Sequence, residues 1–424
     1  MEKSYQTKNG VTVYTYKNPS LHSFYISLFL MSGSMYESEG ENGITHLLEH
    51  SLVRNVNKLE GGNLYSSLDS KGLEFNASTF AEMVQFYISG TSARFSDAAR
   101  IISSLLSPIV LSRRELEAEV KRIRAEIRES DDKNSLAGFS NSIVHEGTAL
   151  STSIVGTNSC VSKISLKRLE AYRQEAFSKP NVFFYVTGNF TESDIEYLSE
   201  CIEKYELKIA PIKENIAPVQ KNFASRAIAV NVKNAEYTMV RFSFDLDMTK
   251  MSVAETDIIY DVLFSGYASR FFMELSERRG MIYDINGAIE RYRNIGQLFF
   301  SFELSSRDIY DAVELSIDIL RRMKSELIPP ENMMKASYVD GAYSLYDDAR
   351  EFNFTMAYDA HVMNLPYLAI EDRKRAYDAV TPERIMAISK EIFNTKNLVF
   401  TMKGNKKKTD TERIEKLLLE LDRD

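Results

Sequence analysis

The segment NGITHLLEHSLVRN places two histidines and a glutamate, His46, Glu49 and His50, in the order H-x-x-E-H. On a helix, positions i, i+3 and i+4 share one face, so both imidazoles can reach one metal ion with the carboxylate beside it. Neutral imidazoles suit zinc, and an adjacent glutamate can accept a proton as a zinc-bound water attacks a carbonyl. These residues predict a zinc centre with one ion per chain and Glu49 as general base.

The motif is specific, because this inverted form of H-E-x-x-H is a zinc-peptidase signature. With five histidines in 424 residues, chance would produce about 0.005 such motifs per chain. For the other histidines, His22, His145 and His361, we expect hydrogen-bonded structural roles. Zinc is inferred from ligand chemistry, and Mn²⁺ or Co²⁺ fits the same ligands.

A catalytic zinc site normally has three protein ligands, so a further carboxylate is expected. The best source is the stretch Leu111–Ser130, in which Ser112 and Glu115 form a capping box at the start of a helix. An apolar stripe at helical spacing follows: Leu116, Val120, Ile123 and Ile127. Glu117 and Glu119 lie on opposite flanks of this stripe, so periodicity does not choose between them. We expect most other acidic residues of this stretch to be solvated charges on the surface of the helix.

The elements that must position these residues occur twice in the chain. Ser165–Asn189 aligns without gaps on Thr381–Asn405, a shift of 381 − 165 = 216 residues, and both copies predict a capped helix, a turn and a buried strand. Gln85–Ile102 and Leu298–Ile317 repeat a strand, a polar turn and an amphipathic helix at about the same shift. Half of 424 is 212, so the repeat indicates a duplicated domain.

Within each half, strand-like and helical stretches follow the order strands, helix, strands, helices. This order predicts an α+β fold of two homologous domains, each a mainly antiparallel sheet flanked by helices. The stretch 207–223 contains two prolines and mixed charges, which suit an extended connector. We therefore expect a zinc-binding domain over 1–206, a linker over 207–223 and a homologous domain over 224–424.

Composition excludes several other classes of protein. Lys and Arg number 52 against 60 Asp and Glu, a net charge of −8, and the longest basic run is Lys406–Lys408, which argues against a nucleic-acid partner. Two cysteines, Cys160 and Cys201, fit a reducing compartment. The start lacks the apolar core of a secretion signal, and apolar runs such as Phe24–Met31 are much shorter than the ~20 residues of a membrane helix. We expect a cytoplasmic protein without a membrane span.

On these motifs, nearly the whole chain resembles the pitrilysin and insulinase family of inverzincin metallopeptidases. The similarity is greatest to short members such as mitochondrial processing peptidase and its bacterial relatives. Beyond H-L-L-E-H, the family's E-x-E-x6-E spacing is found at Glu117, Glu119 and Glu126. In that register the resemblance implies Glu117 as zinc ligand, with Glu119 as the fallback. The separation 117 − 50 = 67 is several residues shorter than usual for the family and implies a trimmed loop.

A second match concerns substrate binding in the first half. Gly72–Tyr87 resembles the family's Asn-Ala-x-Thr strand, with Asn76, Ala77 and Thr79 at the motif positions. The resemblance implies that the edge of this strand pairs with the substrate backbone. Main-chain hydrogen bonds of this kind hold an extended peptide while demanding little of its sequence.

A third match lies in the second half. Ser269–Ala288 resembles the segment by which the C-terminal domain contacts substrate, and Tyr283 matches the family tyrosine that can hydrogen-bond the oxyanion. The companion arginine is replaced by Ser276, which cannot supply its charge, and Arg278 and Arg279 project differently on a helix. Heterodimeric members divide these parts between subunits, which is compatible with the missing arginine.

The resemblance implies two halves closed as a clam-shell around a chamber for short or unfolded peptides. Ala254–Gly266 stands where the first half has its H-x-x-E-H motif and carries no histidine pair. We therefore predict a zinc endopeptidase of peptides, dimeric with itself or with a homologous subunit. By analogy with bacterial relatives, it would process a ribosomally made precursor, as in bacteriocin maturation. The alternative is a non-catalytic, peptide-binding or structural subunit of the same fold.

Overall fold

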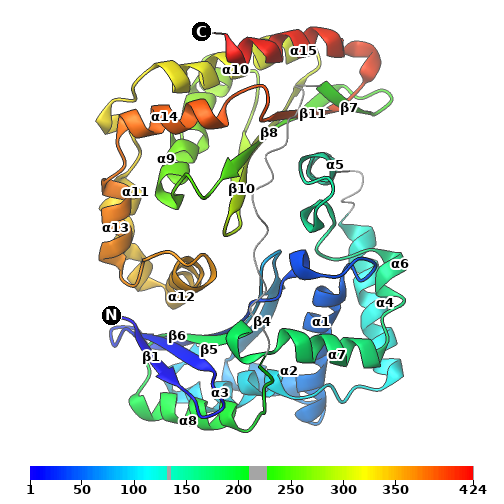
Figure 1. Cartoon of the computed structure of the whole chain (residues 1–424), viewed down its shortest axis with the longest axis vertical. Coiled ribbons are helices and arrows are strands. Elements are labelled where there is room, and N and C mark those ends of the chain that lie inside the picture. Colours follow the sequence, from blue (N-terminus) through cyan, green and yellow to red (C-terminus); the bar gives the residue numbers. More distant parts are fainter. Residues whose placement is uncertain (131–134, 210–226, 424) are drawn as a thin grey trace. The chain divides into compact units, whose positions relative to one another are not determined.

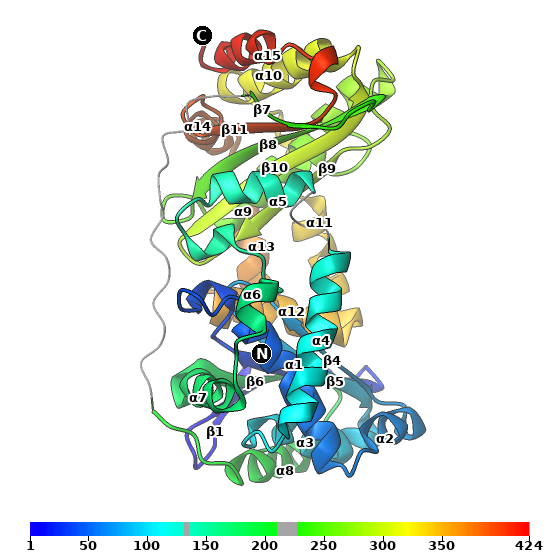
Figure 2. The same ribbon diagram turned by 90° about the vertical axis from the view of Figure 1, so that its right-hand side faces the viewer.

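The computed structural model describes residues 1–130, 135–209 and 227–423. The chain forms two compact units, coloured by sequence in Figures 1 and 2. Unit 1 comprises Met1–Asp131, Gly147–Glu214 and Tyr343–Asp372. Unit 2 comprises Asp132–Glu146, Asn215–Ala342 and Arg373–Asp424.

Unit 1 contains a six-stranded sheet in the order β1-β2-β6-β3-β5-β4. Its strands are β1 (Lys3–Gln6), β2 (Thr12–Lys17), β3 (Ser23–Leu30), β4 (Glu74–Thr79), β5 (Val84–Thr91) and β6 (Val182–Gly188). Neighbouring strands are antiparallel except for the parallel pair β2 and β6.

Unit 2 contains a five-stranded sheet in the order β7-β11-β8-β10-β9. Its strands are β7 (Ala227–Asn231), β8 (Tyr237–Asp247), β9 (Asn286–Arg291), β10 (Ile295–Ser305) and β11 (Leu398–Gly404). Again one neighbouring pair is parallel, β7 with β11, and the others are antiparallel.

The predicted α+β duplication is confirmed by this topology. Without β1, the order in unit 1 is β2-β6-β3-β5-β4, which matches β7-β11-β8-β10-β9 strand for strand, including the single parallel pair. The repeated helices α7 (Leu166–Ala176) and α14 (Pro382–Ile392) begin 382 − 166 = 216 residues apart. Their N-cap residues, Ser165 and Thr381, each accept the backbone N–H three residues further on.

Helices cover the sheets and enclose one apolar core in each unit. The helices of unit 1 are α1 (Ile44–Leu59), α2 (Leu64–Lys71), α3 (Phe95–Ser103), α4 (Arg113–Glu129), α6 (Asn158–Val161), α7, α8 (Glu192–Glu203) and α12 (Ala349–Ala357). Those of unit 2 are α5 (Leu136–Val144), α9 (Val253–Phe264), α10 (Ile309–Ser325), α11 (Ala336–Val339), α14 and α15 (Thr411–Leu419). Helix α13 (Ile370–Asp378) follows α12 in the chain. Among the described residues, no helix combines the length and apolar character needed to cross a membrane.

Two helices pack in the unit that is formed mainly by the other half of the sequence. Helix α12, from the C-terminal half, packs on β3 and β6 of unit 1 (Figure 1), where buried Asn353 accepts from Ser27 Oγ at 2.6 Å and donates to the Tyr185 carbonyl at 2.9 Å. Helix α5, from the N-terminal half, packs on β8 and β11 of unit 2 (Figure 2), where Ser140 and Thr401 share a hydroxyl hydrogen bond of 2.5 Å.

This exchange explains why the compact units do not coincide with the continuous domains expected over 1–206 and 224–424. Most of the expected linker, residues 210–223, lies outside the described residues. The clam-shell arrangement of the two domains stays a prediction.

Candidate metal centre

Helix α1 presents the H-x-x-E-H residues on one face because its other face is apolar. Leu47, Leu48 and Leu52 are buried in the core of unit 1. The helix lacks a side-chain cap of its own, since its N-cap is Gly43 with φ of 93°. Glu37 supplies the cap from outside the helix: its carboxylate accepts the N–H of Gly43 at 2.8 Å and that of Thr45 at 2.9 Å.

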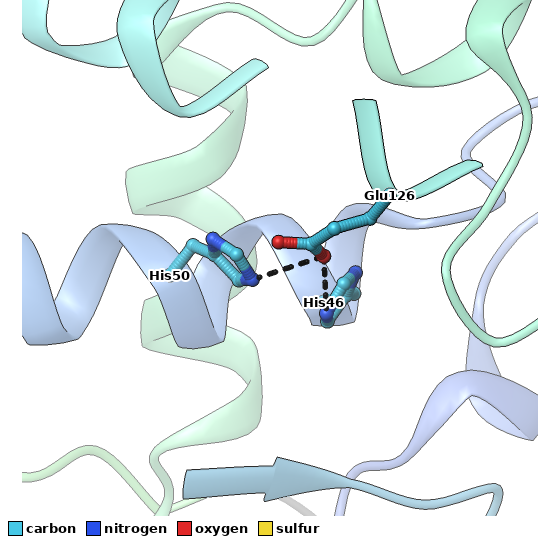
Figure 3. Close-up of side chains that lie close together, drawn as sticks. All are labelled: His46, His50 and Glu126. Atoms are coloured by element: carbon cyan, nitrogen blue, oxygen red, sulfur yellow. Dashed lines mark ion pairs between the residues drawn. The ribbon is translucent and has the colours of Figure 1, made fainter. Parts of the chain in front are cut away.

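Helix α4 brings a third carboxylate to the two histidines. Its predicted capping box is confirmed, with Ser112 and Glu115 bonded reciprocally. Glu126 Oε2 lies 3.7 Å from His46 Nε2 and 3.5 Å from His50 Nε2. Figure 3 marks both pairs with dashed lines. His46, His50 and Glu126 form the only metal-type cluster of three or more His, Cys, Asp or Glu in the parts of the chain that the structure describes.

The spacing of these three side chains fits a zinc ion. Zinc binds imidazole nitrogen and carboxylate oxygen at about 2.0–2.2 Å with tetrahedral geometry. Two ligand atoms at that distance and angle lie about 3.4 Å apart, close to the 3.5 and 3.7 Å observed. One nitrogen of each histidine therefore faces a position that a zinc ion can fill.

Glu117 is not brought to the histidines. Its side chain is 62% exposed and pairs with Arg113 at 2.8 Å. Each helical residue turns the side chain by about 100°, so the 126 − 117 = 9 residues between these glutamates place them on opposite sides of α4. The last glutamate of the E-x-E-x6-E pattern, not the first, faces α1. Glu126 lies nine residues further along the chain than Glu117, so its separation from His50 does not require a trimmed loop.

Glu119, the fallback ligand, contacts Nδ1 of His50, whereas Nε2 of the same ring faces Glu126. This fully buried carboxylate lies 3.4 Å from His50 Nδ1 and also binds Arg54 and Arg122. Burial acts to raise the pKa of Glu119, but the hydrogen bonds from His50 and Arg54 and the charges of both arginines lower it below its usual range. An ionised Glu119 favours a proton on Nδ1 of His50, which leaves the Nε2 lone pair for a metal.

His46 is suited to metal binding by its environment. It is 9% exposed, and burial, followed by the charge of His50, lowers its pKa to about 4. The imidazole is therefore neutral near pH 7, the state in which it can donate a lone pair. For His50, burial acts to lower the pKa, but the hydrogen bond to Glu119 and the nearby carboxylates raise it above its usual value.

Glu49 lies beside the cluster with one oxygen already engaged. Its Oε2 accepts a hydrogen bond of 2.6 Å from the hydroxyl of Thr79, the last residue of β4. Burial raises the pKa of Glu49, while Thr79 and His50 act in the opposite direction. A carboxylate of raised pKa, next to a metal position and with one oxygen held, has the properties of a general base.

The predicted substrate-binding residues Asn76 and Ala77 lie on β4, at the edge of the sheet. Strand β4 pairs with β5 and has no second strand neighbour among the described residues. Asn76 is exposed, and its side chain accepts the N–H of Ala77 at 2.8 Å. The free edge is therefore available to an extended peptide.

Tyr283 lies in unit 2 and is 96% exposed. Ser276 lies within a π-helical turn, Phe272–Glu277. Arg278 and Arg279 both bind the Glu274 carboxylate, at 2.5 and 2.6 Å. The role of Tyr283 toward the metal centre stays a prediction.

Three features of this centre were not predicted from the sequence: Glu126 at the histidines, Thr79 at Glu49, and Glu37 at the start of α1. For Glu126 a signal was present. Positions 119 and 126 are two helical turns apart and so share a face, which the apolar neighbour Ile123 marks as buried. The contacts of Thr79 and Glu37 join separate elements and leave no local pattern.

Comparison with known proteins identifies a family for this chain. The model "Insulinase (Peptidase family M16)" matches residues 12–158, and "Peptidase M16 inactive domain" matches residues 163–336. The chain belongs to this family of peptidases. The second match covers much of unit 2, where α9 carries no histidine.

Individual relatives are distant but cover much of the chain. An uncharacterized zinc protease of Rickettsia felis is 23% identical over 410 residues, 93% of this chain and 94% of that protein. The beta subunit of mitochondrial-processing peptidase from Rattus norvegicus is 24% identical over 195 residues, 46% of this chain and 40% of that protein. The crystal structure of a protease from Helicobacter pylori shares the fold, with a TM-score of 0.84 at 15% identity over 95% of this chain and 99% of that one.

Proposed function

We propose that this protein is a zinc-dependent endopeptidase that hydrolyses short or unfolded peptides. The observation that carries the proposal is the convergence of His46 Nε2, His50 Nε2 and Glu126 Oε2 beside the buried Glu49. The relative named as a zinc protease over nearly the full length supports the same class.

In this proposal His46, His50 and Glu126 hold one zinc ion, and Glu119 orients His50. When bound, zinc supplies a Lewis acid that polarises a carbonyl and lowers the pKa of a water molecule. The neutral state of His46 and the ion pairs of Glu119 prepare the ligands for this role.

Glu49 moves the protons of the reaction. It takes a proton from the attacking water, whose oxygen forms the new bond to the carbonyl carbon of the peptide. The carbon–nitrogen bond then breaks, and the proton held by Glu49 passes to the leaving amine. The raised pKa of Glu49 suits both steps, because the same group must accept and then release a proton near neutral pH.

The edge of β4 holds the substrate backbone in this proposal, at Asn76 and Ala77, and Tyr283 stays a predicted substrate contact. A partner subunit supplies the positive charge missing at Ser276. Two observations support a partner: Arg278 and Arg279 are already engaged by Glu274, and one relative is named as a subunit of a peptidase. The cytoplasmic location and the processing of a peptide precursor stay predictions.

The test combines metal analysis with cleavage of an unstructured quenched-fluorescent peptide by the wild type, Glu49→Gln and Glu117→Gln. We expect about one zinc per chain in all three proteins and loss of cleavage in Glu49→Gln alone. A wild type without zinc would overturn the proposal. Zinc without cleavage, in the presence of any copurifying partner, would replace it by a peptide-binding subunit.

A further inference from the structure

Thr79 joins the two functional elements of unit 1. It is the last residue of β4, the strand with the free edge, and its hydroxyl reaches Glu49 on α1 at 2.6 Å. Along β4, exposure alternates: Asn76 and Ser78 are exposed, whereas Ala77 and Thr79 are half-buried on the side of the core. The strand register therefore directs the Thr79 side chain toward α1.

The direction of this hydrogen bond is fixed by chemistry. An ionised carboxylate only accepts, so the Thr79 hydroxyl must donate to Glu49 Oε2. Threonine is branched at Cβ, so its χ1 angle has few alternatives and the hydroxyl is held in place. One oxygen of Glu49 is thereby occupied, and Oε1 is left to take a proton.

A carboxylate next to a metal position has a competing option. Carboxylate oxygen is itself a zinc ligand, and Glu49 precedes the ligand His50 directly on α1. A Glu49 that turned toward the ion would add a ligand and lose its function as a base. The hydrogen bond from Thr79 opposes that turn.

We propose that Thr79 is a positioning residue, which holds Glu49 away from the metal and selects Oε1 as the oxygen that accepts the proton. This inference rests on the proposed function. It gives the substrate-binding strand a second role, because the strand that pairs with the peptide also sets the orientation of the base.

Two substitutions test the role of the hydroxyl. Thr79→Val keeps the shape and removes the donor, and Thr79→Ser restores a donor on a less restricted side chain. A hydrogen bond to a charged group corresponds to a factor of about 10–100 in rate, so we expect kcat of Thr79→Val to fall by that factor with KM within about twofold. Thr79→Ser should keep most of the wild-type kcat. As a matched control, Thr12→Val removes a hydroxyl that bonds Gln6 in the same sheet at 3.0 Å, and kcat should not change.

A second readout does not depend on turnover. In the cobalt-substituted protein, Thr79→Val should show weaker visible absorption, as expected when Glu49 joins the metal and raises its coordination number. The double variant Thr79→Val/Glu49→Gln should return to the wild-type spectrum, because an amide is a poorer ligand than a carboxylate.

The inference is overturned if the Thr79→Val spectrum equals that of the wild type, or if Thr79→Ser loses as much kcat as Thr79→Val at equal thermal stability. Failure of the proposed function looks different: the wild type itself would then bind no cobalt or cleave no peptide.

Discussion

Helix α1 in unit 1 and helix α9 in unit 2 occupy equivalent places in two copies of one fold. Each packs on the edge strand of its sheet, α1 on β4 and α9 on β9. A shift of 256 − 45 = 211 residues aligns their buried positions: Thr45 with Thr256, Leu47 with Ile258, Leu48 with Ile259 and Leu52 with Leu263. The same shift places Asp257 opposite His46, Tyr260 opposite Glu49 and Asp261 opposite His50.

The two helices differ in how their polar side chains are satisfied. In unit 2, Asp257 binds Arg291 and the Tyr377 hydroxyl, and Tyr260 donates to the Gly287 carbonyl at 3.0 Å. In unit 1, the Nε2 atoms of His46 and His50 both face Glu126 at distances longer than a hydrogen bond. In unit 2, Asp257 and Tyr260 are engaged in internal hydrogen bonds, whereas in unit 1 one ring nitrogen of each histidine faces Glu126 without a hydrogen bond.

The largest expected effect is a difference in zinc affinity between variants of two glutamates of α4. Glu126→Ala should lower zinc affinity at least about 100-fold, because it removes a ligand and even a residue that only orients a ligand contributes 10–100-fold. Cleavage should be lost with the metal. Glu117→Ala is the matched control and should leave both unchanged, since that side chain pairs with Arg113 at the surface. Competition with a chelator measures the affinities, and the reverse ranking would restore Glu117 as the ligand.

A smaller effect is expected at Glu119. Glu119→Gln should lower zinc affinity about 10–100-fold, because an amide orients His50 less strongly than a carboxylate and leaves two arginines without their buried partner. The chelator competition applies here as well. An affinity equal to that of the wild type would show that His50 does not need this partner.

The equivalent change in unit 2 should affect stability and not metal binding. Asp257→Asn removes the negative charge that Arg291 binds and weakens the bond from Tyr377. We expect the free energy of unfolding to fall by about 2 kcal/mol, measured in urea, with zinc content at the wild-type level. Loss of zinc in this variant would contradict the division between the two helices.

The smallest expected effect concerns how the helices begin. Helix α9 carries its own capping box, Ser252 with Glu255, whereas α1 relies on Glu37 from a preceding segment. Glu37→Gln leaves one acceptor oxygen for two N–H groups and should cost about 1 kcal/mol, as should Ser252→Ala. Thermal unfolding measures both variants. Zinc affinity should weaken only in Glu37→Gln, and an equal loss in Ser252→Ala would show that the effect is not local to α1.

Much of the fold was predictable because it depends on local patterns. The gapless repeat of helix and strand at a shift of 216 residues indicated two copies of one topology, and both sheets confirm it. The exchange of α5 and α12 was not predictable, because an amphipathic helix of nine residues does not show in its own sequence which sheet it will cover.

The candidate metal centre also combines residues that a local pattern predicts with residues that only packing brings together. His46, Glu49 and His50 lie within five residues of one helix, so their spacing alone placed them together. The sequence did not indicate which carboxylate lies next to the histidines, because α4 carries several glutamates and the one that meets the histidines depends on how α4 packs against α1. Glu119, which is fully buried, and Glu126, which is partly exposed, lie on the face toward α1, and their order in the motif does not reveal this.

The origin of α12 has a consequence for synthesis of the chain. The N-terminus emerges from the ribosome first, so all six strands of unit 1 and the residues of the candidate metal cluster are made well before residue 349. Until α12 arrives, the face of the sheet that carries Ser27 and Gln85 lacks the cover that Asn353 completes. Domains usually fold in the order of synthesis. In this protein, translation of unit 1 begins first, but unit 1 cannot complete its fold until most of unit 2 has been translated.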